Sequence, residues 1–281
     1  MRNTSITQLL KSARYEVIPT PGIEASIVAA VPRTVTITVT ASPVKGLDST
    51  LDLSERLVGH GYRVVPHLSA RLVADELHLK HIVDRLVALG VDDVFIPAGD
   101  ADPPAGRYDG ALGVLAELTA MGRPFRHVGI TGYPESHPAI DDDVTIQSMW
   151  DKRPHATYIV SNLCFDHRTL ATWVSRVRRR GVDLPIMVGI AGPVERAKLL
   201  KVATKIGVGE SAKFITRHPS WLLRFAAPGG YSPDRLLDRC VPVLTAPESN
   251  VAGLHIFTFN QIAETETWRR NLAPHPDTTP A

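Results

Sequence analysis

Short runs rich in apolar and β-branched residues recur along the chain, and helical patterns fill the spaces between them. Such runs occur at 15–19, 34–41, 63–70, 93–98, 126–133, 157–165, 186–191 and 254–260. Their centres are mostly continuous in apolar or β-branched residues, which is typical of parallel strands buried on both faces. This alternation constrains the fold more than any other feature of the sequence.

The segments between these runs carry Leu and Val at three- and four-residue spacing, the pattern of a helix with one apolar face. The clearest helical patterns lie at 50–61, 74–90, 108–122, 167–181 and 193–207. Each of them ends in a glycine, the residue that most readily closes a helix. Strands that alternate with helices in this way predict an α/β fold, a (β/α)8 TIM barrel, rather than an open sheet.

A length of 281 residues suits one such barrel, and 44% hydrophobic residues provide for a large core. We therefore predict a single catalytic domain over 1–272 and a disordered, proline-rich tail over 273–281. Residues 208–249 are too long for one connection between the seventh and eighth strands. Their sequence predicts extra helices around a turn at PGGYSP.

Composition disfavours several other classes of protein. The net charge is +2, and the one basic run, 176–181, lies where arginines favour a helix C-terminus rather than nucleic acid. Two cysteines, Cys164 and Cys240, are too few for a disulfide framework and are expected to be core thiols. The sequence shows neither a transmembrane-length apolar run nor a signal peptide. We expect a cytoplasmic monomer or homodimer with no nucleic-acid or membrane partner.

Polar side chains fall at or just after the ends of six successive predicted strands. They are Glu16, Thr38 with Thr40, His67, Asp100, Tyr133 with Glu135 and His137, and Asn162. In a (β/α)8 barrel the carboxyl ends of the strands surround one mouth, where active sites are found. We therefore predict that these residues meet at the mouth and include the functional groups.

Glu16 is the first candidate for catalysis, because it lies inside the apolar run YEVIP. Charged residues are rarely buried without a function or a partner. A carboxyl group in apolar surroundings favours its protonated form and can serve as a general acid. The alternative is a structural ion pair with an arginine such as Arg14 or Arg33.

The other candidates have structural alternatives too. His67 is a candidate base or hydrogen-bond donor, or a histidine packed in the core. Asp100 follows Gly99, which lets a ligand approach the backbone, but an aspartate here also suits a helix cap or a turn. In the rigid loop GYPESHP at 132–138, His137 or Glu135 could be simple turn residues. The acids at 141–143 indicate a solvated helix start, and no spacing indicates a metal triad.

Eight motifs occur in order along the predicted strands. They are YEVIPTPG, TITVTA, PHLSA, AGDADPP, GYPESHP, SNLCFD, IMVGIAGP and HIFTFNQ. Each is weak alone, but in this order they resemble the methylenetetrahydrofolate reductase family from about residue 15 to about residue 272. The resemblance implies a barrel enzyme of one-carbon metabolism that supplies methionine biosynthesis.

The reaction implied by the resemblance is reduction of 5,10-methylenetetrahydrofolate to 5-methyltetrahydrofolate by hydride from NADH or NADPH. Glu16 would protonate N10 as the imidazolidine ring opens, and Asp100 would stabilise the cationic iminium and hold the pterin. Asn162 replaces a pterin-binding glutamine of the family and would bind the substrate. The cofactor-binding positions would be Thr38, His67, Gly99, Tyr133 and His137.

Two departures from the family pattern concern its flavin. The arginine that precedes Gly-Asp in the family is Ala98 here, and Trp150 lies near a second expected arginine. The acids at 141–143 would add repulsion near a diphosphate, while Lys152 and Arg153 lie close enough in sequence to compensate partly. We predict that FAD is absent or weakly bound, and that hydride passes directly from the nicotinamide to the folate.

Two other functions compete with this interpretation. A different pterin- or phosphate-binding barrel, such as a transferase or lyase, would have no need for the glutamate of the first strand. A non-catalytic or regulatory folate- or pterin-binding homologue would keep the mouth and lack turnover. Folate binding without NADH oxidation would distinguish this second alternative from a reductase.

Overall fold

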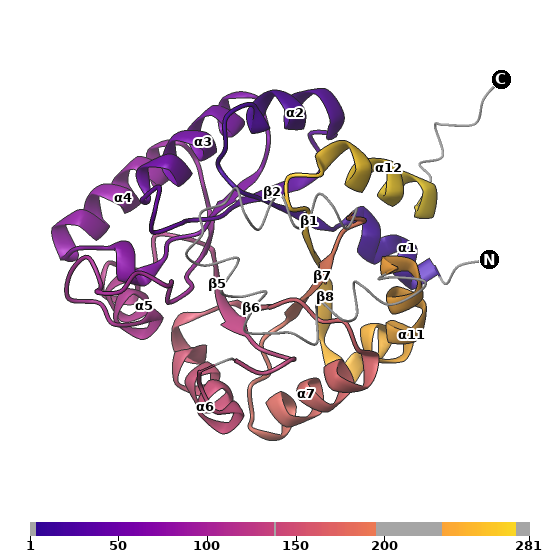
Figure 1. Ribbon diagram of the computed structural model, residues 1–281. Coiled ribbons are helices and arrows are strands. Elements are labelled where there is room, and N and C mark those ends of the chain that lie inside the picture. Colours follow the sequence, from indigo (N-terminus) through magenta and orange to yellow (C-terminus); the bar gives the residue numbers. More distant parts are fainter. Residues whose placement is uncertain (1–3, 138, 195–231, 274–281) are drawn as a thin grey trace.

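Eight parallel strands form a barrel, and helices are arranged around it (Figure 1). The computed structural model describes residues 4–137, 139–194 and 232–273. The strands are β1 Arg14–Val17, β2 Thr36–Val39, β3 Val64–Pro66, β4 Asp93–Phe95, β5 His127–Gly132, β6 Tyr158–Ser161, β7 Ile186–Ala191 and β8 Val251–Phe257. The predicted single-domain (β/α)8 barrel is confirmed.

Strands that are neighbours in the sequence are neighbours in the barrel, and β8 pairs with β1. The order is β3-β2-β1-β8-β7-β6-β5-β4. A parallel bridge between His67 and Phe95 joins β3 to β4, and Leu68 N–H donates to the Phe95 carbonyl at 2.8 Å. The strand predicted at 63–70 therefore ends earlier, at Pro66, and His67 stands where the barrel closes.

Helices connect these strands. They are α1 Thr4–Lys11, α2 Ile23–Ala30, α3 Asp48–Gly59, α4 Glu76–Ala88, α5 Ala111–Ala120, α6 Asp142–Lys152, α7 His167–Arg179, α11 Pro233–Thr245 and α12 Ile262–Leu272, with short 3-10 turns η1 Ala70–Leu72, η2 Arg153–His155 and η3 Pro247–Ser249. The predicted helices at 50–61, 74–90, 108–122 and 167–181 correspond to α3, α4, α5 and α7. Asp141 caps α6, as the acids at 141–143 indicate.

Other predictions are tested only in part. The helix predicted at 193–207 lies almost entirely outside the described residues, as do the first half of 208–249 and all but one residue of the tail. The last of the extra helices is α11, which begins at Pro233. Cys164 and Cys240 are buried free thiols, as expected.

The end of the barrel where the strands begin is closed by a polar cluster. Arg14 Nη2 lies 3.0 Å from Asp93 Oδ2, and the Tyr158 hydroxyl donates to Asp93 Oδ1 at 2.7 Å. Next to this cluster the interior is apolar, and Val65 and Met187 belong to the same buried hydrophobic cluster as Tyr158. Because side chains fill this end, a ligand would approach from the opposite end, where the strands finish.

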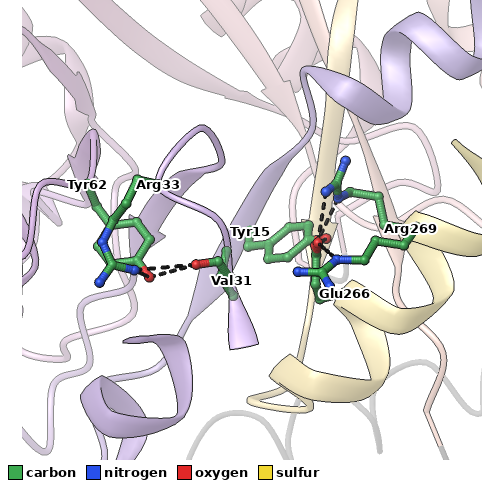
Figure 2. A network of polar contacts seen from close by, with 7 residues as sticks. Tyr15, Val31, Arg33, Tyr62, Glu266 and Arg269 are labelled. Carbon is green, nitrogen blue, oxygen red and sulfur yellow. Dashed lines mark hydrogen bonds and ion pairs between the residues drawn. The ribbon is translucent and has the colours of Figure 1, made fainter. Parts of the chain in front are cut away.

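A buried network on the outside of the barrel fixes β1 against α12 (Figure 2). The Tyr15 hydroxyl donates to Glu266 Oε2 at 2.7 Å, and Arg269 donates to both carboxylate oxygens of Glu266, at 2.9 and 2.8 Å. All three side chains are buried. Because side chains alternate along a strand, Tyr15 on the outside directs Glu16 to the inside of the barrel.

We expect Glu266→Gln to lower the free energy of unfolding by about 3 kcal/mol, because it leaves the buried Arg269 without its counter-charge. Urea unfolding followed by circular dichroism measures this loss. Asp84→Asn is the matched control, since it breaks an exposed ion pair with Lys80 and should change stability by less than about 1 kcal/mol. Equal effects of the two substitutions would contradict a structural role for the network.

The loss should also depend on pH. Burial acts to raise the pKa of Glu266, but hydrogen bonds from Arg269, Tyr15 and Arg270 outweigh it and lower the pKa below its ordinary value. The stabilisation is therefore complete above the unfolded glutamate pKa of about 4.3, and it is lost as pH falls through the lower folded value. The difference between wild type and Glu266→Gln should shrink only in acid.

Candidate active site

Glu16 lies inside the barrel beside a histidine of the last strand. Glu16 Oε2 is 2.9 Å from His255 Nε2, and the two side chains are 16% and 1% exposed. The carboxyl group is thus within reach of a ligand, while its partner is fully enclosed. The arginine alternatives are wrong, because Arg14 pairs with Asp93 and Arg33 lies against Tyr62 (Figure 2).

His67 joins this pair from the third strand. Glu16, His67 and His255 each offer one nitrogen or oxygen atom, and these three atoms lie within 4.8 Å of one another. The two imidazole rings have centroids 6.3 Å apart. Phe95 packs edge-on against His67 and Phe257 against His255, so aromatic rings hold both imidazoles in place.

Several polar atoms in this region are buried without a hydrogen-bond partner among the described residues. They include Thr38 Oγ1, His67 Nε2 and His255 Nδ1. Thr38 lies on β2 in direct register with Glu16 of β1. Because buried polar groups in folded proteins are nearly always paired, their grouping indicates that a ligand or solvent completes this part of the barrel.

The backbone around Glu16 is held by the segment that follows β8. Thr258 Oγ1 donates to the Glu16 carbonyl at 2.6 Å. Asn260 exchanges two hydrogen bonds with the backbone of Ile18, at 2.9 and 3.0 Å. Phe259 and Asn260 both have positive φ, of 50° and 59°, a strained conformation that these contacts maintain. The acid is therefore positioned by main-chain contacts as well as by His255.

The predicted residues that follow β4 and β5 lie on another side of the mouth. Asp100 is exposed and follows Gly99, whose φ of 83° and close approach to Ser69 leave no room for a side chain. Burial raises the pKa of the Tyr133 hydroxyl; a hydrogen bond with Thr131 opposes this shift, and the negative charge of Asp100 adds to it. The ring of His137 packs edge-on against Tyr133, with centroids 4.9 Å apart.

Asn162 and Glu135 shape the loop after β6. Asn162 Oδ1 accepts from Leu163 N–H at 2.8 Å, which directs the side-chain oxygen back to its own turn. Glu135 Oε1 accepts from the backbone N–H groups of Phe165 and Asp166, at 2.7 and 3.1 Å. Glu135 therefore fits the interpretation as a turn residue. For Asn162, the hydrogen bond to its own turn uses the side-chain oxygen and not the amide nitrogen.

Sequence reasoning missed His255. The residue lies within the predicted strand 254–260, but only the pairing of β8 with β1 shows that it contacts Glu16. The sequence did hold a signal for His255. Alternate residues of a strand face the same side, and among the inward-facing Gly253, His255 and Phe257 of β8 only His255 is polar. Of the predicted site residues, the structure brings Glu16 and His67 together and places Thr38 beside them.

The comparison with protein families agrees with this arrangement of strands and loops. The methylenetetrahydrofolate reductase family model matches residues 25–267. The chain belongs to the methylenetetrahydrofolate reductase family. The matched region includes the positions of Thr38, His67, Asp100, Asn162 and His255, and it begins after Glu16. Any role for Glu16 therefore rests on the geometry of β1 and on the sequence resemblance of its strand.

Individual relatives of the reductase family are more distant. The chain is 26% identical over 171 residues to methylenetetrahydrofolate reductase 2 of Saccharomyces cerevisiae. That match covers 58% of this chain and 28% of the yeast protein, so the chain spans only a minor part of that relative.

Solved structures share the general barrel. One is dihydropteroate synthase from Thermus thermophilus in complex with 6HMPPP, with a TM-score of 0.45, 13% identity and 94% of each chain covered. Another, from Burkholderia cenocepacia J2315, is provisionally assigned as a lyase/mutase, with a TM-score of 0.47, 16% identity, and 88% of this chain and 97% of that chain covered. These similarities carry no argument about function. Among the described residues, no helix is long and apolar enough to cross a membrane.

His67 should be a neutral imidazole throughout the physiological pH range. Burial lowers its pKa to about 4, which the Glu16 carboxylate partly opposes and His255 reinforces. The unfolded side chain has a pKa of about 6.5, so stability is full above that pH and falls as pH drops towards the folded value. Nitrogen-15 NMR of the imidazole should show no protonation of His67 at pH 6. A protonated ring at that pH would contradict the burial described here.

Proposed function

We propose that the protein reduces 5,10-methylenetetrahydrofolate to 5-methyltetrahydrofolate, with hydride supplied by NADH or NADPH. The product would feed methionine biosynthesis in the cytoplasm, and the chain would act as a monomer or homodimer. Membership of the methylenetetrahydrofolate reductase family supports the substrate class. The observation that carries the proposal is the partly exposed Glu16 carboxyl, held at 2.9 Å by the buried His255.

Glu16 would act as the general acid. Opening of the imidazolidine ring expels an amine, N10, which leaves more easily when it receives a proton. A carboxyl group held from two sides, by His255 through its side chain and by Thr258 through its backbone, has one preferred direction. Such positioning aligns the proton with the leaving nitrogen and lowers the barrier of this step. The product of the step is a cationic methylene iminium.

The iminium would be stabilised by a negative charge across the mouth. Asp100 is an exposed carboxylate beyond β4, and Tyr133, the first residue after β5, would provide an aromatic surface. Asn162 would donate from its amide nitrogen to the pterin, since its oxygen is engaged with Leu163. The folate would then lie between the loops after β4 and β6, with its reacting carbon towards Glu16.

The nicotinamide would occupy the part of the mouth formed by Thr38 and His67. Thr38 Oγ1 and His67 Nε2 are buried without partners among the described residues, so both can bind the carboxamide of the cofactor. Gly99 and the ring pair Tyr133 and His137 would border the remainder of the cofactor. Hydride would pass from the nicotinamide to the methylene carbon, which gains the electron pair as the iminium charge is lost.

The fold also shows where the two basic residues lie that could replace the family's flavin-binding arginines. Lys152 is the last residue of α6, a helix that runs from the mouth back to the end where strands begin, and Arg153 follows it. The Arg153 guanidinium stacks on Trp150 at 3.8 Å. These two residues therefore lie away from the mouth, and the partial compensation expected from the sequence finds no support. At the mouth end of the same helix, Asp142 and Asp143 pair with Arg176.

Arg71 contacts Ala98 through its backbone. Arg71 donates its backbone N–H to the Ala98 carbonyl at 2.9 Å, and its guanidinium is 3.5 Å from Asp102. Arg71 comes from the turn after β3, so it would reach the cofactor from another direction than the family's arginine. We assign it to the diphosphate of the nicotinamide cofactor, whose ring would lie over the neighbouring His67.

Glu16→Gln should bind folate normally and lose turnover by about 10²-fold or more, because the amide cannot supply the proton. The measurement is steady-state NADH oxidation together with calorimetric binding of 5-methyltetrahydrofolate. Glu24→Gln is the matched control, since Glu24 is a surface glutamate that also contacts a histidine, His60, at 2.9 Å. Near-normal turnover of Glu16→Gln would remove Glu16 from the mechanism. Folate binding by the wild type without NADH oxidation would favour a non-catalytic folate-binding protein.

The purified protein should show no flavin absorbance and should follow sequential kinetics, because direct transfer requires both substrates to be bound together. Loss of one charged hydrogen bond costs about 1.5–3 kcal/mol, or roughly 10- to 150-fold in flavin affinity. Ala98→Arg should therefore bind added FAD more tightly than the wild type. Stoichiometric flavin in the wild type, or parallel double-reciprocal lines, would overturn direct transfer.

A further inference from the structure

The side chains of Glu16, His67 and His255 converge at one point inside the barrel. The proposed reduction uses them separately, Glu16 with His255 for proton transfer and His67 for the carboxamide of the cofactor. One ligand atom from each residue lies within 4.8 Å of the other two. The three residues come from β1, β8 and the residue directly after β3, so the barrel wall rather than a surface loop holds them.

This donor set is that of a transition-metal site. Two imidazoles and one carboxylate suit Zn²⁺ and related ions, whereas Mg²⁺ and Ca²⁺ prefer sites made of oxygen atoms alone. His67 Nε2 is buried, and no hydrogen bond reaches it from the residues that the structure describes. A histidine that served only as packing in the core would normally have its ring nitrogens paired.

The geometry requires only a small adjustment. Ligand atoms about 2.0–2.1 Å from a tetrahedral zinc ion lie about 3.3 Å from one another. With the present atoms within 4.8 Å, no pair has to approach by more than about 1.5 Å, a distance that side-chain rotation can supply. The contact of Glu16 with His255 at 2.9 Å would open slightly as both turn towards the ion.

We propose that Glu16, His67 and His255 bind a zinc ion, with the fourth position open towards the mouth. Three protein ligands and one open position are the arrangement of accessible zinc sites. The bound ion would occupy the Glu16 carboxylate and so exclude folate from productive binding. Because the ion would also occupy His67, which the proposed function assigns to the nicotinamide, zinc would thus be an inhibitor that competes with both folate and the nicotinamide cofactor. Formation of the site depends on the three side chains alone and not on the proposed reduction.

Cobalt(II) is the probe for this site, because its visible absorption reports tetrahedral nitrogen and oxygen ligation and ignores loosely bound surface ions. Titration of the full chain with CoCl₂ should produce these bands, and zinc should displace them. Glu16→Gln, His67→Gln and His255→Gln should each weaken metal binding by about tenfold or more. His60→Ala is the control, since it removes an exposed histidine–carboxylate pair, His60 with Glu24, and should change nothing.

Two further measurements keep the proposal testable if the buried histidine variants fail to fold. Zinc should raise the melting temperature of the wild type and not that of Glu16→Gln, whose altered side chain is partly exposed. Saturating 5-methyltetrahydrofolate should weaken cobalt binding. Absence of tetrahedral bands, or an equal effect of His60→Ala, would overturn the zinc site. An inactive protein that still showed the bands would instead contradict the proposed reductase.

Discussion

The pairing of β8 with β1 is the contact on which both the barrel and its site depend. Inside the barrel it sets His255 against Glu16 at 2.9 Å, across a separation of 239 residues. On the outside of the barrel, Tyr15 of β1 donates a hydrogen bond to the buried Glu266 of α12. At the strand ends, Thr258 holds the Glu16 carbonyl. A change that loosened the pairing of β8 with β1 would open the barrel. It would at the same time separate the Glu16 carboxyl group from His255.

The two ends of the barrel interior are both polar, but they differ in how completely their groups are paired. At the end where strands begin, Arg14, Asp93 and Tyr158 satisfy one another. At the mouth, Thr38 and His67 keep buried atoms without partners among the described residues. A fully satisfied network adds rigidity and needs no ligand, whereas an incomplete one costs stability unless something binds. This contrast supports the mouth as the functional end without reference to any family.

The fold could be predicted from the sequence because continuous apolar runs and helical spacing are local signals. The same signals placed Glu16, Thr38 and His67 at strand ends. They could not show the role of His255, which depends on register between the first and last strands, nor that Lys152 lies away from the mouth. The short helices α1 and α2 escaped prediction, since each is only eight residues long.

Carboxyl groups at the mouth suit the positively charged species that the two proposals place there. Burial keeps His67 neutral at physiological pH by lowering its pKa, so it adds no positive charge beside the carboxyl group of Glu16. Asp100 adds a second carboxylate on another side. In the proposed reduction both the iminium and the oxidised nicotinamide are cations, and a protonated His67 would repel each of them. A divalent metal likewise binds histidine only in its unprotonated form. In the two proposals the transferred proton and the metal ion therefore compete for the carboxyl group of Glu16, and occupancy by one excludes the other.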